Sequence, residues 1–390
     1  MTDIPDARAG ADALVAQAME STGLEDFGGK EFREGLEVYW ESAFGEAQLN
    51  GLGTAAVTAN IVGSLANRLR VVDWAARHSE VAVERIEAPL VVIGMFRAGT
   101  TLFSKLLDQD PGNRALLRWE AADSVPPPSP DQFRSGPRVD AARAGMEMLE
   151  TLNPKMAVVH HEEADGPTEC ISVMSQDFKS LSWEAVSNVP SYSRWLLAVD
   201  QRSAYEYHHL VLQVLQHGGV RGRWTLKSPH HAIALESLHA VYPDARLVLI
   251  HRDPVTLCAS VCSLIQTLTS TFTDADHTRY IAEHWTAMLE TSIKRVEAFR
   301  AAHPDQPIVD VQYDDLVADP VRTVARVYEA FGDELGQAPR AAMADYVSNR
   351  DQHRAGAHTY DPTEFGLDPH ELAERFAGYT ERYQVPTTTR

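Results

Sequence analysis

The sequence of 390 residues has little positive charge. It contains 35 Lys and Arg residues against 55 Asp and Glu residues, which gives a formal net charge of −20 at pH 7. Proteins that bind DNA or RNA present a broad basic surface to the phosphates, so this balance argues against a nucleic-acid partner. Any anionic ligand must instead be held by a small local cluster of cationic side chains. Because the chain has only six lysines, Lys227 inside an apolar segment draws attention.

Cysteines and long apolar runs are also scarce. The three cysteines, Cys170, Cys258 and Cys262, form neither a metal-ligand spacing nor an even disulfide framework, which fits a reducing cytoplasm. No run of 18 apolar residues occurs, and the first residues lack the pattern of a secretory leader. We therefore expect a cytoplasmic protein without an integral membrane segment. The sequence leaves a homo-oligomer open.

The hydrophobic pattern changes along the chain. Residues 12–85 carry apolar side chains every four residues, as at Ile61, Leu65 and Leu69, which predicts helices. From Pro89 onward, four short β-rich runs, PLVVIGM, RWTLK, ARLVLIH and PIVDVQY, alternate with helical stretches. This alternation predicts an α/β fold with a mostly parallel sheet flanked by helices. We expect an α-helical N-terminal segment at 1–86 and an α/β domain at 87–390. Within that domain, a largely helical insertion at 119–217 is expected to bind the acceptor.

The first predicted strand leads into a loop that resembles a P-loop. The segment VVIGMFRAGTT reads as strand, tight loop and helix start, but Thr100 stands where the nucleotide-triphosphate signature requires lysine. The positive charge lies earlier, at Arg97. Backbone N–H groups between Gly94 and Thr101 can surround an anion at the N-terminus of the following helix, and Arg97 adds further donors.

Two later strands end in residues of similar chemistry. Lys227 closes the run RWTLK and is followed by His230 and His231. The run ARLVLIH is followed by Arg252, and Ser260 lies about two turns along the next helix, so both can reach one phosphate. Ligands bind at the carboxyl ends of parallel strands. The residues at the ends of these two strands and the first loop are therefore predicted to form one anion site.

Taken in order, these motifs resemble those of the sulfotransferases that use 3′-phosphoadenosine 5′-phosphosulfate (PAPS). R-x-G-T-T at Arg97 is similar to the family's 5′-phosphosulfate loop, and HRDP with Ser260 is similar to its 3′-phosphate motif. The segments WTLKSPHHAIALESLHAVYPDARLVLIHRDP and AHTYDPTEFGLDP resemble the bacterial branch of the family. The resemblance covers most of the chain and implies a P-loop-like fold.

The resemblance implies a set of binding residues. The nucleotide site would comprise Arg97, Ala98, Gly99, Thr100, Thr101, Leu102, Arg252, Ser260, His358 and Tyr360. Thr101 would hydrogen-bond the 5′-phosphate, and Arg97 would meet the charge that develops as the sulfuryl group leaves. His358 and Tyr360 match the family's C-terminal motif. They either line the nucleotide site or face solvent. A sulfuryl group carries less charge than a transferring phosphoryl group, so no metal is expected.

The sequence leaves two readings for the base that deprotonates the acceptor. One is His230 or His231, because imidazole accepts a proton near neutral pH and follows Lys227 closely. The other is Glu120, since other branches of the family place a catalytic glutamate there, although it can also be an ordinary helix-terminal acid. We rank Glu120 ahead because one of two adjacent histidines is often a helix-start residue.

The sequence thus predicts an enzyme that transfers a sulfuryl group from PAPS to a hydroxyl of a small-molecule, lipid or sugar acceptor by in-line displacement. Arg97 and Lys227 would act in catalysis together with the base. The alternatives are a non-catalytic nucleotide-binding protein on the same scaffold and a kinase-like phosphotransferase. The missing P-loop lysine argues against the kinase.

Overall fold

The computed structural model describes residues 6–155, 162–350 and 361–387. Its internal contacts separate two compact units. The helical unit combines the chain up to Ile86 with Leu117–Arg221 and Thr267–His277. The sheet unit combines Glu87–Leu116, Gly222–Gln266 and the residues from Thr278 onward.

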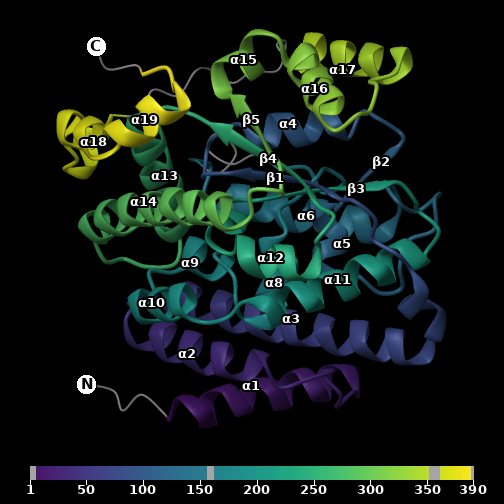
Figure 1. The fold of residues 1–390 in the computed structure, drawn as a ribbon. Coiled ribbons are helices and arrows are strands. Elements are labelled where there is room, and N and C mark those ends of the chain that lie inside the picture. The colour runs from purple at the N-terminus through teal and green to yellow at the C-terminus, as the bar shows by residue number, and fades with distance from the viewer. Residues whose placement is uncertain (1–5, 156–161, 351–360, 388–390) are drawn as a thin grey trace. The chain divides into compact units, whose positions relative to one another are not determined.

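The helical unit begins with three long helices that lie side by side (Figure 1). The longest is α3, in which Ile61, Leu65 and Leu69 form one fully buried face, as their spacing predicts. Asn50 caps this helix by accepting a hydrogen bond from the Gly53 N–H at 2.8 Å. The described helices of this unit are α1 (Ala7–Thr22), α2 (Phe32–Gly45), α3 (Gly51–Arg77), η1 (Ser79–Val83), α5 (Arg118–Ala122), α6 (Pro137–Leu152), α8 (Ile171–Met174), η2 (Ser175–Asp177), α9 (Ser182–Val186), α10 (Pro190–Ala198) and α11 (Arg202–His217).

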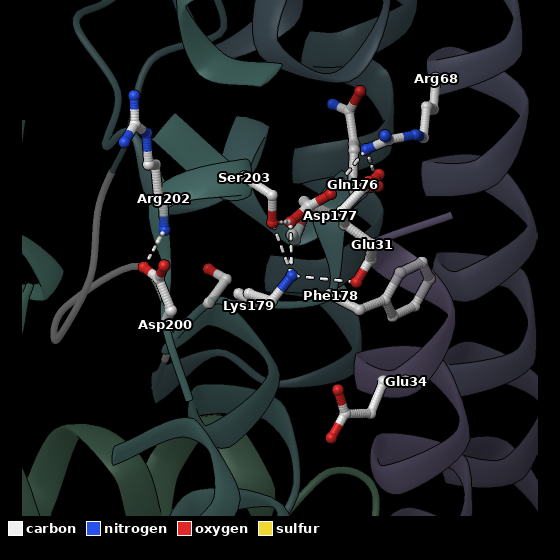
Figure 2. A network of polar contacts seen from close by, with 12 residues as sticks. Glu31, Glu34, Arg68, Gln176, Asp177, Phe178, Lys179, Asp200, Arg202 and Ser203 are labelled. Atoms are coloured by element: carbon white, nitrogen blue, oxygen red, sulfur yellow. Dashed lines mark hydrogen bonds and ion pairs between the residues drawn. The ribbon is translucent and has the colours of Figure 1, made fainter. Parts of the chain in front are cut away.

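A buried polar network lies inside the helical unit (Figure 2). The Asp177 carboxylate accepts hydrogen bonds from Arg68 Nη1 at 2.9 Å, Lys179 Nζ at 3.1 Å and Ser203 Oγ at 2.6 Å. Lys179 also donates to the backbone carbonyl of Glu31. Both cations therefore pair with the same carboxylate and are hydrogen-bonded within the unit, which a buried charge requires. We call these residues the Asp177 network.

The sheet unit contains five parallel strands in the order β2-β3-β1-β4-β5. Figure 1 shows α4 and α16 on one side of this sheet and α12 and α14 on the other. The elements are β1 (Leu90–Gly94), α4 (Thr100–Leu107), β2 (Asn113–Ala115), β3 (Arg223–Ser228), η3 (Pro229–Ile233), α12 (Leu235–Val241), β4 (Arg246–His251), α13 (Pro254–Thr269), α14 (Thr278–Ala302), β5 (Ile308–Gln312), α15 (Tyr313–Ala318), α16 (Pro320–Ala330), α17 (Gln337–Arg350), η5 (Pro362–Phe365), α18 (Pro369–Arg375) and α19 (Ala377–Tyr383).

The expected parallel α/β architecture with an α-helical N-terminal segment is confirmed. All four predicted strands are present, and β2 is an additional strand of only three residues. Its sequence carries no apolar run, and it forms by pairing with β3, where Arg114 stacks over the Trp224 ring at 4.5 Å. No helix in the described ranges is long and apolar enough to cross a membrane.

The strand order brings the candidates of the sheet unit together. The chain passes from β1 to β2 at one edge, returns to β3 between them, and then crosses to β4 on the other side of β1. The loop after β1 therefore lies at the point where the direction of winding reverses, which is where open parallel sheets bind ligands. The residues that follow β3 and β4 flank it on either side.

Candidate active site

The loop between β1 and α4 has a backbone suited to an anion. Arg97 has φ of 68° and Gly99 has φ of 92°, so both adopt left-handed conformations. Only glycine fits at Gly99, because a Cβ there would approach the Tyr313 ring at 2.8 Å. Left-handed residues alternating with ordinary ones turn successive N–H groups toward one concave side, directly before the N-terminus of α4. A left-handed arginine costs about 1 kcal/mol or more, a strain that proteins retain mainly at functional sites.

The remaining loop residues differ in exposure. Ala98, Thr100 and Leu102 are buried, and Thr101 is exposed at the start of α4. A Cβ at Gly94 would collide with the Thr100 methyl group at 2.3 Å, so the close turn requires glycine at the end of β1. The exposed Thr101 hydroxyl is the one that stands in the P-loop's serine or threonine position.

The two phosphate motifs that the sequence separates meet in the fold. Arg97 Nε donates to Ser260 Oγ at 3.1 Å, although 163 residues separate them. Arg252 Nη1 donates to the backbone carbonyl of Arg97 at 2.6 Å, across 155 residues. Asp253 caps α13 and accepts from the Thr256 hydroxyl at 2.7 Å, which fixes the helix that carries Ser260. We call Arg97, Arg252 and Ser260, with the loop backbone, the arginine site.

Tyr313 is a member of this site that the sequence reasoning missed. It is the first residue after β5, and the Arg252 guanidinium lies 4.1 Å from the centre of its ring. This cation–π contact holds the guanidinium flat while leaving N–H groups at its edge. The signal was present in the sequence, since Tyr313 leaves a predicted strand at the same sheet edge as the other candidates.

Lys227 and His230 belong to the strand beside β1. Lys227 is buried on β3 and pairs in register with Val92 of β1. Ser228 Oγ accepts from the His230 N–H at 3.1 Å, which begins the short helix η3. Burial, aided by the charge of Arg295, lowers the pKa of His230 to about 3. His230 is therefore neutral at pH 7 but a very weak base in this conformation.

The other two base candidates are also buried. His231 lies in η3 and is 1% exposed. Glu120 belongs to the helical unit, in α5, where its Oε2 accepts from the Leu117 N–H at 3.1 Å and its side chain is fully buried. The capping role weighed for Glu120 is thus present in the structure.

Two of the predicted nucleotide-site residues, His358 and Tyr360, lie outside the described residues. Within the ranges that the structure describes, no group of three His, Cys, Asp or Glu side chains is arranged to hold a metal ion. The metal-free reaction stays a prediction.

A narrow apolar pocket adjoins the arginine site within the sheet unit. Its lining includes Met95 and Phe96 from the loop, Pro229 two residues after Lys227, and Trp285 from α14. The Phe96 and Trp285 rings meet edge to face with their centres 4.8 Å apart. The cavity holds only about 20 Å³ and Met95 and Trp285 are buried, so it has room for a group no larger than a water molecule.

A model described as "Sulfotransferase family" matches residues 89–336. A curated relative from Mycobacterium bovis, omega-hydroxy-beta-dihydromenaquinone-9 sulfotransferase Stf3, is 23% identical over 291 residues, which cover 67% of this chain and 69% of the relative. The same-named protein from Mycobacterium tuberculosis matches to the same extent.

Two solved structures resemble the whole chain. Sulfotransferase STF9 from Mycobacterium avium is 32% identical, with a TM-score of 0.90, and the match covers 100% of both chains. Sulfotransferase STF1 from Mycobacterium tuberculosis H37Rv is 33% identical, with a TM-score of 0.83, over 94% of this chain and 98% of that one.

Proposed function

Because this chain belongs to the sulfotransferase family, we propose that it transfers a sulfuryl group from PAPS to a hydroxyl group of a lipid-like acceptor. The observation that carries the proposal is the arginine site. Direct hydrogen bonds join Arg97 to Arg252 and to Ser260, which lie 155 and 163 residues further along the chain, at the carboxyl ends of the strands. A protein with net charge −20 gathers two guanidinium groups there, which suits a ligand with separate anionic groups.

The donor set fits the chemistry of PAPS. The left-handed backbone at Arg97 and Gly99, followed by the N-terminus of α4, suits the 5′-phosphosulfate end. Arg252 and Ser260 suit the 3′-phosphate, because a guanidinium and a hydroxyl both donate to phosphate oxygens. Ala98, Thr100, Thr101 and Leu102 would complete the loop around the 5′-phosphate.

Arg97 and Lys227 are proposed to stabilise charge during transfer. PAPS supplies an activated sulfuryl group whose leaving oxygen gains negative charge as the bond breaks. Arg97 belongs to the left-handed loop that would hold that end of the donor, and Lys227 lies on the strand next to β1. Preorganised cations in a partly buried site stabilise developing charge more strongly than water does, because the protein dipoles need not reorient.

Glu120 is the base that we propose for the acceptor hydroxyl. Its carboxylate is buried, while the pKa of His230 is lowered to about 3. A base is most effective when its pKa lies near the working pH, so the lowered pKa weakens the case for His230. His231 remains the second candidate for proton transfer.

The acceptor is proposed to carry an apolar portion. The mycobacterial relatives are named for an omega-hydroxy-beta-dihydromenaquinone, a hydroxylated lipid-like compound. This name favours a hydroxylated lipid over a sugar.

The test is incubation of the purified chain with ³⁵S-labelled PAPS and a panel of hydroxylated lipids, small phenols and sugars, with and without a chelator. We expect label on a lipid hydroxyl and no effect of the chelator. Label on sugars alone would contradict the lipid acceptor. A requirement for Mg²⁺ with ATP as donor would contradict sulfuryl transfer.

A further inference from the structure

The last helix of the chain contacts the backbone that carries Arg252. Tyr379 in α19 is buried, and its hydroxyl lies 2.9 Å from His251 Nδ1. The same phenol makes a hydrogen bond with the backbone of Arg252. A side chain 127 residues downstream thus holds the strand end from which the Arg252 guanidinium projects into the arginine site.

His251 is fixed on its other side as well. Its Nε2 lies 2.8 Å from the Asp310 carboxylate on β5, and Asp310 also pairs with Arg300. The His251 ring stacks on Tyr383 with ring centres 4.4 Å apart. Burial pushes the pKa of Asp310 up, but the hydrogen bond from His251 and the charge of Arg300 outweigh it, so the pKa is lowered and Asp310 is ionised at neutral pH.

These partners set the direction of each hydrogen bond. An ionised carboxylate only accepts, so His251 Nε2 carries a proton and donates to Asp310. With a neutral ring, Nδ1 accepts and the Tyr379 O–H donates to it. The phenol oxygen then accepts the backbone N–H of Arg252. Every hydrogen bond in the series from Arg252 through Tyr379 and His251 to Asp310 has a donor and an acceptor in this arrangement.

We propose that Tyr379 is a positioning residue for the 3′-phosphate of the sulfuryl donor, acting through the backbone of His251 and Arg252. The inference rests on the proposed function, since it requires Arg252 to bind that phosphate. The phenol fixes the peptide from which the guanidinium departs, so that less freedom of that backbone is lost when the phosphate binds.

The test compares two ligands in the full chain carrying Tyr379→Phe. Adenosine 3′,5′-bisphosphate has the 3′-phosphate, and adenosine 5′-monophosphate lacks it. Calorimetry should show bisphosphate binding weakened about 3- to 10-fold, as for one lost neutral hydrogen bond, and monophosphate binding unchanged within error. KM for PAPS should rise by the same factor while kcat stays constant, because the bond acts before the chemical step.

Tyr383→Phe is the matched control, because it makes the same substitution on the same helix and keeps the ring stacked on His251. We expect the binding of both ligands to stay within about 2-fold of the wild type. Equal losses for both ligands in Tyr379→Phe would show a merely structural role and overturn the inference, as would no loss for either. If the wild type does not prefer the bisphosphate, the proposed 3′-phosphate site fails and the inference fails with it.

A measurement on the wild type covers the case in which Tyr379→Phe does not fold. Coupling between two sites is reciprocal, so a ligand that uses Arg252 must stabilise what holds Arg252. Bisphosphate should slow amide hydrogen exchange in α19 several-fold more than saturating monophosphate does. Equal protection by the two ligands would contradict the inference. If the preference for the bisphosphate is lost only in Arg252→Ala, the proposed function stands and the inference fails.

Discussion

Two clusters of cations in this protein are partnered in different ways. In the Asp177 network, Arg68 and Lys179 share one fully buried carboxylate and the backbone carbonyls around it (Figure 2). In the arginine site, the partners of the Arg252 guanidinium within the described residues are a backbone carbonyl and an aromatic ring. Arg252 thus keeps its full positive charge and several N–H donors.

The difference separates cations that stabilise the fold from the cation that we propose binds the ligand. Asp177 pairs with both cations of its network, and removal of that carboxylate leaves unpaired buried charges. A carbonyl and a ring hold Arg252 in place without neutralising it. Such a side chain gains most when an anion arrives, since charge-assisted hydrogen bonds are about twice as strong as neutral ones.

The largest expected effect concerns Glu120, another buried carboxylate of the helical unit. Glu120→Gln keeps the shape of the side chain and an acceptor for the Leu117 N–H, but it cannot take a proton. If Glu120 is the base, the transfer step should slow roughly 100- to 10,000-fold with PAPS saturating, and nucleotide binding should persist. Rapid-mixing measurement of the first turnover isolates this step from product release.

His230→Asn and His231→Asn serve as the comparison for that result. We expect smaller losses from both, because they would act through orientation of the acceptor or of Lys227. Transfer near the wild-type rate in Glu120→Gln, together with a larger loss in one histidine variant, would move the role of base to that histidine. Retention of transfer in all three would mean that the acceptor site lies elsewhere.

Asp177→Asn tests the stabilising half of the comparison. It leaves Arg68 and Lys179 buried without a counter-charge, so the free energy of unfolding should fall by about 3–5 kcal/mol. Urea unfolding measures this loss. Glu206→Gln is the control, because it breaks an exposed ion pair with Arg202 and should cost less than about 0.5 kcal/mol. Similar losses in both variants would contradict a special stabilising role for the buried Asp177 network.

Arg97→Ala and Lys227→Ala test the proposal that cations at the carboxyl ends of the strands act in catalysis. Each should lower kcat about 100- to 1,000-fold, because the charge that these residues meet appears chiefly in the transition state. Affinity for adenosine 3′,5′-bisphosphate should change much less. Steady-state kinetics and calorimetry on the same preparations check the two quantities. Intact turnover with weakened nucleotide binding would make both residues anchors for the ligand.

Arg252→Ala isolates the 3′-phosphate contact. Loss of a hydrogen bond to a charged group should weaken bisphosphate binding by about 1.5–3 kcal/mol and leave monophosphate binding nearly unchanged. Calorimetry with both ligands measures the difference. The thermal stability of the apoprotein should change little, in contrast to Asp177→Asn. Equal weakening of both ligands would remove the assignment.

The smallest effect concerns pH. Burial lowers the pKa of His208 in α11 to about 3, whereas an unfolded histidine titrates near roughly 6.5. The unfolded state therefore binds more protons below pH 6.5, so stability falls as the pH drops toward 3. Each such histidine should cost about 1.4 kcal/mol at pH 5.5 relative to neutral pH. Urea unfolding of His208→Gln should show a flatter dependence between pH 7 and 5.5; an unchanged slope would contradict this.

Much of the site could be predicted from local patterns. Arg97, Lys227 and Arg252 were identified because each leaves a β-rich run, and parallel strands bring their carboxyl ends to one edge. Tyr313 was missed because the end of its strand carries no positive charge and its role depends on stacking under Arg252. Tyr379 was beyond reach, since no local pattern links a C-terminal tyrosine to His251.

The sequence by itself determined the alternation of strands and helices, the glycines of the loop and the scarcity of cations, because these follow from periodicity, side-chain size and charge counts. Only the tertiary structure decided that Arg97 donates to Ser260, that Arg252 rests on Tyr313, and that burial lowers the pKa of His230. Contacts across more than 60 residues depend on how the strands are ordered in the sheet, and a pKa depends on what surrounds the group in three dimensions.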